Sequence, residues 1–142
     1  MLKIMFLCTA NACRSQMAEG WARKLGKALL EPYSAGLIAA GLHPRAVAVM
    51  REVGIDISEQ KSKEIDSNLL MQMDVVITLC GQAEATCPLT PPNIKRLYWP
   101  VNDPVGTRGS EEVIMNDFRR ARNEIRDRVT EFIRDIVKSG CA

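Results

Sequence analysis

The first hydrophobic segment of the chain is an almost continuous apolar run over residues 2–7. Such a run is typical of a strand covered on both faces, as in a parallel sheet. From Ser15 onward, apolar positions recur three and four residues apart, which predicts a helix with Ser15 as its N-terminal cap. Its apolar face comprises Ala18, Trp21, Ala22, Leu25 and Leu29. Residues 8–14 are therefore expected to form a strand-to-helix loop.

The alternation of strand and helix patterns continues along the chain. Residues 34–36 are expected to end a second strand, and Pro44 to open a helix that Gly54 stops. Residues 65–73 predict a further helix, and the β-branched run 74–79 predicts a central strand. Cys80 would then follow the carboxyl end of that strand.

The last third of the chain begins with residues 81–93, a proline-rich loop with room for one helical turn. Residues 94–99 predict a fourth strand, and residues 100–110 are rich in turn formers. A long helix follows, with its apolar face formed by Phe118, Ala121, Ile125, Val129, Phe132, Ile133 and Ile136. The pattern predicts one α/β domain over residues 1–142, with an open, mainly four-stranded parallel sheet flanked by helices. Ligands of such sheets bind beyond the carboxyl ends of the strands.

Charge and composition narrow the possible partners. The 19 Lys and Arg residues nearly balance 17 Asp and Glu residues, so charge gives no reason to expect a nucleic acid or a membrane surface. No apolar stretch approaches the roughly 18 to 20 residues of a membrane span. The apolar stretch at the start of the chain is too short for the hydrophobic region of a secretory signal. We therefore expect a cytoplasmic protein, and we expect it to be a monomer.

The chain has five cysteines, which are Cys8, Cys13, Cys80, Cys87 and Cys141. In a reducing compartment such thiols are reactive, metal-binding or simply buried. The sole histidine is His43, and the cysteine pairs are five and seven positions apart, unlike the closely spaced pairs of structural zinc sites. We therefore expect no bound metal.

The strand-to-helix loop carries the strongest chemical signal. A loop of this length can converge its backbone amides on one anion, and the N-terminus of the following helix adds its positive dipole end. Arg14 offers a planar fork of donors to two oxygens of that anion, and the same amides favour Cys8 as a nucleophilic thiolate. The alternative is a buried cysteine with an unrelated surface arginine. The predicted substrate-binding residues after Cys8 are Thr9, Ala10, Asn11, Ala12, Cys13, Arg14 and Ser15.

This segment resembles the signature of low molecular weight tyrosine phosphatases and of the arsenate reductases that share their fold, usually C-x-G-N-x-C-R-S. The sequence departs from it at Ala10, where the family generally has glycine. Residues 15–21, 33–36, 54–58 and 78–80 also match. Because both activities share several of these segments, they indicate the fold rather than the reaction.

Asp103, followed by Pro104, matches the general acid of the family, which protonates the leaving oxygen. The alternative is an aspartate that merely starts a turn. In the phosphatases an aromatic residue usually follows this pair and lines the phosphotyrosine slot, whereas here Val105 follows. The resemblance therefore favours a small inorganic oxyanion such as arsenate as the substrate.

Cys80 and Cys87, with the prolines after them, resemble the redox segment of thioredoxin-coupled arsenate reductases. The resemblance implies a relay in which Cys8 attacks arsenate, Cys80 attacks Cys8 and Cys87 attacks Cys80. The resemblance implies that thioredoxin is the external reductant and that the protein itself binds no cofactor. It also implies a role in arsenical resistance. Gln82, where a glutaredoxin-coupled subgroup would have a closer resolving cysteine, argues against that route.

Two other functions remain open. A low molecular weight protein-tyrosine phosphatase would use Cys8, Arg14 and Asp103 alone, and a noncatalytic oxyanion sensor would need only the loop and Arg14. The joint presence of Asp103 and the Cys80 to Cys87 pair favours the reductase. Cys13 is expected to be structural, and we assign no function to Cys141 or His43.

The resemblance also implies how the loop is supported. Some thioredoxin-coupled members match this chain at Asn11, Glu19 and Ser34 and use these positions, with a later carboxylate, to bind potassium beneath the loop. The matching position here is Lys63. A potassium ion would be repelled by an ammonium group, which can itself supply the positive charge that Glu19 requires. The alternative is a solvated lysine on a charged loop.

Overall fold

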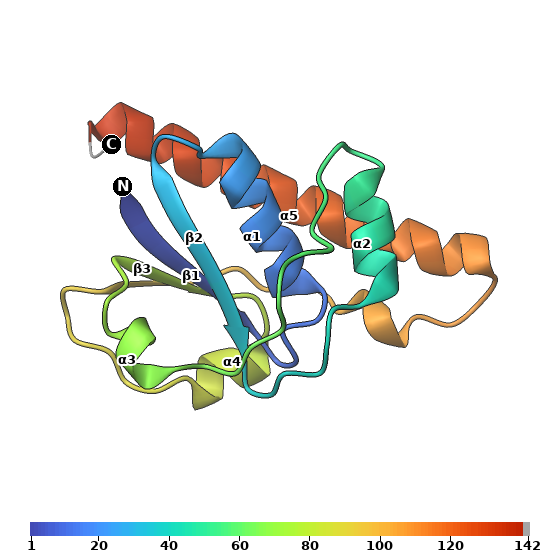
Figure 1. The fold of residues 1–142 in the computed structure, drawn as a ribbon, viewed down its shortest axis with the longest axis horizontal. Coiled ribbons are helices and arrows are strands. Elements are labelled where there is room, and N and C mark those ends of the chain that lie inside the picture. The colour runs from blue at the N-terminus through green and yellow to red at the C-terminus, as the bar shows by residue number, and fades with distance from the viewer. Residues whose placement is uncertain (141–142) are drawn as a thin grey trace.

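The computed structural model describes residues 1–140 and contains four strands in one open sheet (Figure 1). The strands are β1 (Leu2–Cys8), β2 (Leu30–Gly36), β3 (Val75–Thr78) and β4 (Lys95–Tyr98). Their order is β2-β1-β3-β4, and every pairing is parallel. The predicted four-stranded α/β fold is therefore confirmed. Cys141 lies outside the described residues.

The long apolar run at the start of the chain forms an interior strand of the sheet. β1 pairs with β2 on one side and with β3 on the other, and its side chains from Ile4 to Leu7 are completely buried. Burial on both faces explains why this strand is continuously hydrophobic rather than alternating. Cys8 is the last residue of β1, so this strand, paired on both sides, places it at the carboxyl edge of the sheet.

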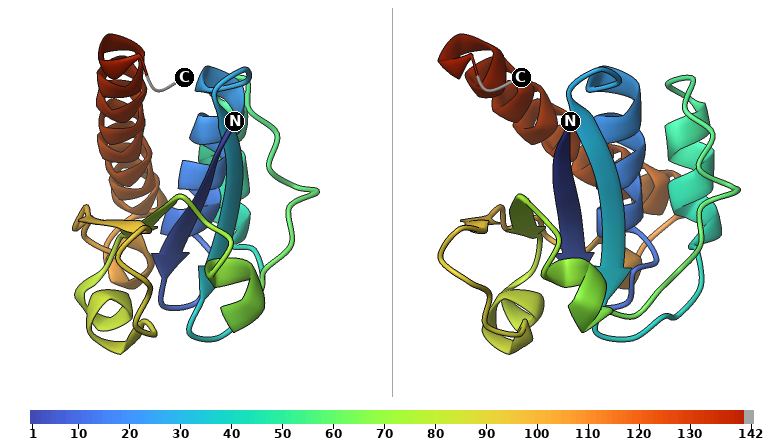
Figure 2. Two further views of the ribbon diagram at one scale, coloured as in Figure 1. Left: turned by 90° about the vertical axis from the view of Figure 1, so that its left-hand side faces the viewer. Right: turned by 60° about the vertical axis from the view of Figure 1, so that its left-hand side comes forward.

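Three longer helices pack against one another, and the first of them lies on the sheet. They are α1 (Arg14–Leu25), α2 (Pro44–Arg51) and α5 (Glu111–Ser139). In the right-hand view of Figure 2, α5 passes behind β1 and β2. Two short helices, α3 (Ser67–Leu70) and α4 (Gly81–Thr86), complete the α-helices of the described chain, and α4 lies beyond the carboxyl end of the strands (Figure 2).

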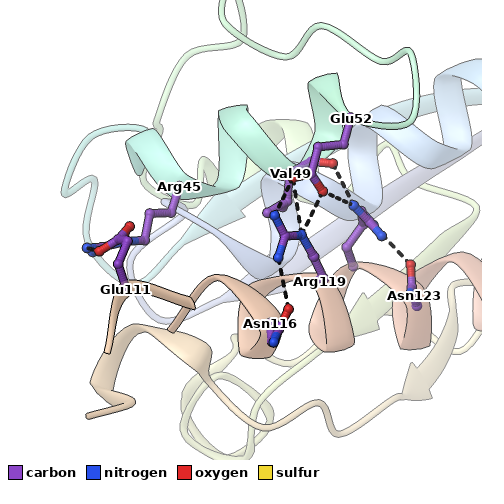
Figure 3. A network of polar contacts seen from close by, with 8 residues as sticks. Arg45, Val49, Glu52, Glu111, Asn116, Arg119 and Asn123 are labelled. Carbon is purple, nitrogen blue, oxygen red and sulfur yellow. Dashed lines mark hydrogen bonds and ion pairs between the residues drawn. The ribbon is translucent and has the colours of Figure 1, made fainter. Parts of the chain in front are cut away.

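A polar network fastens α2 to α5 (Figure 3). Glu52, directly after α2, accepts hydrogen bonds from Arg119 and from Arg122, the latter at 2.8 Å. Arg122 also donates to the carbonyl of Val49 at 2.9 Å, and this arginine is buried. Buried arginine is tolerated because its donors are paired. The network fixes the position of α2, whose first turn adjoins the loop after Cys8.

Three local predictions were wrong. The helix expected over residues 65–73 is only the four-residue α3, which Asp66 caps and which ends in turns before β3. Ser15 is not the cap of α1: the capping position is Cys13, without a side-chain hydrogen bond. The hydroxyl of Ser15 instead contacts the sulfur of Cys8 in the loop. Leu25, expected on the buried face, is 40% exposed at the end of the helix.

Among the described residues, none of the helices combines the length and the hydrophobicity that a membrane span requires.

Candidate active site

The loop between β1 and α1 is held in one shape by Asn11. This residue has a φ of 47° and is completely buried, and it is the sole non-glycine residue of the described chain with positive φ. Asparagine tolerates this left-handed conformation better than most residues. Ala10 therefore needs no glycine-like backbone here. The side-chain oxygen of Asn11 accepts the backbone N–H of Lys63 at 2.8 Å.

Asn11 is also held by a buried amide. The Nε2 atom of Gln16 donates to the backbone oxygen of Asn11 at 3.1 Å and to its side-chain oxygen at 3.0 Å. Gln60 in turn donates to the side-chain oxygen of Gln16 at 2.8 Å. Sequence reasoning gave Gln16 and Gln60 no role, because nothing in the pattern distinguishes a buried amide from an exposed one.

The carbonyl groups of the loop point away from its centre. Those of Thr9, Ala10 and Ala12 accept backbone N–H groups of Ile38, Ala40 and His43 at 2.9 to 3.0 Å. Within the described chain, the N–H groups of residues 9–13 donate to no protein acceptor. Outward carbonyls and unoccupied amides make the loop a concave set of donors, as an anion-binding nest requires.

Gly36 at the end of β2 allows this close approach. A Cβ atom at Gly36 would lie 2.6 Å from the backbone nitrogen of Asn11 and 2.7 Å from the carbonyl oxygen of Ile38. Both neighbours are backbone atoms and cannot swing aside. The glycine in the predicted second strand therefore serves the shape of the loop.

Cys8 and Arg14 meet in this loop. The Sγ atom of Cys8 is buried and lies 2.8 Å from the hydroxyl oxygen of Ser15. Arg14 donates from Nη1 to the carbonyl of Val101 at 2.9 Å, and its Nη2 lies 3.4 Å from the carboxylate of Asp103. The three residues predicted for oxyanion chemistry are thus brought together, with the guanidinium held from behind by a backbone oxygen.

Asp103 stands at the mouth of the site. Its side chain is about half exposed, and it caps the short 3-10 helix η1 (Pro104–Gly106) by accepting the N–H of Val105 at 3.0 Å. The pocket in front of it has a volume of about 230 Å³. Its lining contains no aromatic residue and consists of Cys8, Thr9, Ala10, Ala12, Cys13, Arg14, Gln82, Asp103 and Val105. A larger hollow of about 660 Å³ between α5 and the edge of the sheet holds none of the predicted site residues.

Cys80 lies beside the loop and caps α4. Its sulfur accepts the N–H of Ala83 at 3.4 Å and lies 3.3 Å from the hydroxyl of Thr9. That hydroxyl also donates to the amide oxygen of Gln82 at 3.4 Å. Cys87 is half-buried at the opposite end of the same helix. The two predicted redox cysteines therefore bracket α4, one facing the loop and one remote from it.

Cys13 and His43 have structural surroundings. Burial, followed by the charge of Asp103, raises the pKa of Cys13 far above its ordinary value, so this thiol stays protonated. His43 accepts the N–H of Arg45 and caps α2, and its ring lies 5.0 Å from that of Phe118. Burial lowers the pKa of His43, which keeps the ring neutral and able to cap.

Glu19 lies beneath the loop with two direct partners. Its carboxylate accepts the hydroxyl of Ser34 at 2.6 Å and forms an ion pair with Arg23, also at 2.6 Å. The ammonium of Lys63 donates to the carbonyl of Lys61. Burial lowers the pKa of Lys63 and the nearby Glu19 charge raises it. Lys63 thus acts on Glu19 through its charge, whereas Arg23, which sequence reasoning missed, makes the contact.

The whole chain is similar to one group of known proteins. A model of the low molecular weight phosphotyrosine protein phosphatase family matches residues 3–141. An arsenate reductase of Bacillus subtilis (strain 168) is 53% identical over 129 residues, which is 91% of this chain and 93% of that protein. A solved arsenate reductase in its phosphate-binding state is 39% identical with a TM-score of 0.79, covering 96% of this chain and 99% of that one. A thioredoxin-dependent arsenate reductase of Corynebacterium glutamicum is 26% identical with a TM-score of 0.78, covering 98% of this chain and 63% of that one.

Proposed function

The chain belongs to the low molecular weight phosphotyrosine protein phosphatase family, and within it we propose that this protein reduces arsenate to arsenite. The observation that carries the proposal is the second thiol beside the oxyanion loop. The sulfur of Cys80 lies 3.3 Å from the hydroxyl of Thr9, the residue that follows Cys8. Phosphate hydrolysis has no use for a second thiol at that place, whereas reduction needs one.

The shape of the pocket supports a small inorganic substrate. The cavity of about 230 Å³ has Val105 and Gln82 at its walls, where an aryl phosphate would need a flat apolar surface. Arg14 can meet two oxygens of a tetrahedral oxyanion with its planar fork. Arsenate matches both the size and the charge of this site, and the similar proteins named above are arsenate reductases.

The first step joins arsenic to Cys8. The Cys8 thiolate attacks As(V), and an arsenate oxygen leaves as water after it receives a proton, a transfer that Asp103 is placed to assist. Arg14 and the loop amides hold the remaining oxygens and stabilise the negative charge. Arsenic remains As(V) in the covalent adduct.

The second step transfers two electrons. The Cys80 thiolate attacks the sulfur of Cys8, a disulfide forms between them, and the electron pair of the S–As bond stays on arsenic. Arsenic leaves as arsenite, As(III). The Cys87 thiolate then attacks the sulfur of Cys80, and Cys8 leaves as a thiolate. The disulfide now joins Cys80 and Cys87, away from the buried pocket.

Thioredoxin is the proposed reductant of this outer disulfide. Its dithiol reduces the bond between Cys80 and Cys87 and becomes oxidised, which restores the three thiols. The residues after Cys87 are accessible for such an encounter, because Leu89 is 93% exposed. One similar protein of known structure is a thioredoxin-dependent arsenate reductase. No bound cofactor is required.

Arsenate-dependent oxidation of NADPH in the presence of thioredoxin and thioredoxin reductase tests the function. We expect steady turnover that needs all three components, with the Cys8→Ser variant as the inactive control. Glutathione with glutaredoxin should not replace thioredoxin. If the protein hydrolyses an aryl phosphate but oxidises no NADPH with arsenate, it is a phosphatase that uses Cys8, Arg14 and Asp103 alone.

A further inference from the structure

Arg96 on β4 contacts the chain on both sides of Cys87. Its Nη1 atom donates to the carbonyl of Pro88 at 3.3 Å and to the hydroxyl of Thr90 at 3.5 Å. Its Nη2 atom lies 4.0 Å from the carboxylate of Glu84. Glu84 precedes Cys87 in the sequence, whereas Pro88 and Thr90 follow it. One cation on the sheet thus spans the segment that carries the outer redox thiol.

One donor of this guanidinium lacks a partner. Among the described side chains, only Arg96 Nε and Trp21 Nε1 are buried nitrogen atoms without a hydrogen-bond acceptor. A buried donor left unpaired is destabilising. The guanidinium that carries this donor contacts Pro88, the residue next to the half-buried Cys87. A cationic donor near that thiol would suit a thiolate, because the anionic sulfur accepts a hydrogen bond far better than the neutral one does.

The electrostatics at Cys87 agree with this geometry. Burial raises the pKa of Cys87, and the charge and hydrogen bonding of Arg96 act in the opposite direction. Glu84 also raises the pKa, but its carboxylate is engaged by the hydroxyl of Thr78 as well as by Arg96. Arg96 is thus the cation that offsets the cost of forming a Cys87 thiolate at this place.

We propose that Arg96 is a positioning residue that stabilises the Cys87 thiolate for its attack on Cys80 and fastens the segment around Cys87 to β4 until that attack. The inference rests on the proposed function. In the step it serves, the Cys87 thiol loses its proton to solvent and its sulfur bonds to Cys80. The bond between Cys80 and Cys8 breaks, and Cys8 leaves as a thiolate. One disulfide replaces another, so no further oxidant is needed.

The test is the pH dependence of Cys87 alkylation by iodoacetamide in the fully reduced protein, resolved by peptide mass spectrometry. Arg96→Met removes the charge at similar volume, Arg96→Lys restores the charge, and Lys95→Met removes a charge from the neighbouring position of β4. In Arg96→Met we expect the midpoint to rise by about half to one pH unit, which makes labelling near neutral pH roughly three- to tenfold slower. The midpoints of Arg96→Lys and Lys95→Met should stay close to that of the unmutated protein.

An unchanged or lowered midpoint in Arg96→Met overturns the inference, whatever the limiting rate at high pH. If Arg96→Met does not fold, Arg96→Gln takes its place in the same comparison. This labelling needs neither arsenate nor thioredoxin, so its outcome is independent of the proposed reduction. With one equivalent of arsenate, Arg96→Met should also accumulate the Cys8 to Cys80 disulfide. If no variant forms any disulfide with arsenate, the proposed function fails while the labelling result stands.

Discussion

The hydroxyl oxygen of Ser15 lies 2.8 Å from the sulfur of Cys8. Asn11 donates its side-chain N–H to the same oxygen, also at 2.8 Å. Because the oxygen already accepts from Asn11, the hydroxyl proton is free to point at the sulfur. Ser15 is completely buried, so water does not compete for this bond. The residue that fixes the loop and the nucleophile are therefore linked through one hydroxyl group.

Ser15→Ala should slow both alkylation of Cys8 and arsenate reduction. A hydrogen bond to a charged group contributes about 1.5 to 3 kcal/mol, which corresponds to a roughly ten- to hundredfold loss of rate. The rate constant of Cys8 alkylation at fixed pH measures the effect directly. Ser110→Ala, which removes the hydroxyl that caps α5, is the matched control and should leave this rate unchanged. A Ser15→Ala variant that folds and reacts at the normal rate would contradict the donor role of Ser15.

Substitution of the three cysteines should separate the steps. Cys8→Ser should lose arsenate reduction and any phosphatase activity, because it removes the atom that bonds to the substrate. Cys80→Ser should release no arsenite, and Cys87→Ser should lose multi-turnover reduction, but in both variants Cys8 should remain reactive toward an aryl phosphate. Arsenite release and NADPH oxidation are the two measurements. Normal cycling of Cys87→Ser with thioredoxin would show that the three-thiol relay is wrong.

Oxidation should unwind α4. Cys80 and Cys87 cap opposite ends of this helix, and at 1.5 Å per residue their Cα atoms are roughly 10 Å apart along its axis. A disulfide needs about 4.4 to 6.8 Å between Cα atoms. Hydrogen exchange over residues 81–86 should therefore become faster after one equivalent of arsenate, and peptide mapping should find the Cys80 to Cys87 bridge.

A Cys8 to Cys13 bridge as the main product would contradict this prediction. Cys13 is a poor competitor because burial raises its pKa and keeps it a thiol. The attacking species in disulfide formation is the thiolate. Cys13→Ala should accordingly leave the mapped bridge unchanged, which serves as the control for the oxidation experiment.

The parts of the fold and site that the sequence predicted are those with a local pattern. The apolar run before Cys8 identifies an interior strand, and the C-x5-R spacing identifies the loop from adjacent residues alone. Cys80 was placed correctly because it directly follows a β-branched strand. These features depend on periodicity and on the shared edge of parallel strands.

The contacts made by distant segments could not be predicted in this way. Gln16 and Gln60 meet only because the chain returns across α1, and the role of Arg96 depends on the residues that fold over β4. Ser15 was instead assigned a role that it does not have. Its sequence position suggests a helix cap, but its hydroxyl contacts the sulfur of Cys8. A local propensity gives way when a buried acceptor competes for the same proton.

Acid should weaken the attachment of α2 to α5 (Figure 3). The hydrogen bond from Arg119, assisted by Arg122, lowers the pKa of Glu52 below its ordinary value of 4.5. A depressed carboxyl pKa contributes stability that is present above the unfolded pKa and lost as the pH falls through the folded one. Because Glu52 is partly exposed, solvent screening limits the contribution to about 1 kcal/mol.

Glu52→Gln should therefore lower the melting temperature at neutral pH by a few degrees and by less below about pH 4. Glu131→Gln, on an exposed face of α5, is the matched control and should leave the melting temperature unchanged at both pH values. An equal loss at both pH values would mean that the charge of Glu52 does not contribute.

Potassium should stimulate the enzyme little. Glu19, which the resemblance associates with a potassium site, is already paired with Arg23 and Ser34. Burial lowers the pKa of Lys63, and the negative charge of Glu19 is near enough to oppose that shift. A potassium ion at this place would be repelled by the positive charges of Arg23 and Lys63. Activity measured in potassium and in sodium at constant ionic strength should therefore be nearly equal.

Lys63→Asp should make stability or activity depend on potassium, because it replaces the ammonium beside Glu19 with a carboxylate ligand. The backbone N–H that holds Asn11 is retained in this variant, so the loop keeps its anchor. Lys61→Asp makes the same change of charge on an exposed neighbour and should acquire no potassium dependence. The melting temperature and the arsenate-dependent rate, each titrated with potassium against sodium, decide the matter. Strong potassium-specific activation of the unmutated protein would mean that Lys63 does not substitute for the ion.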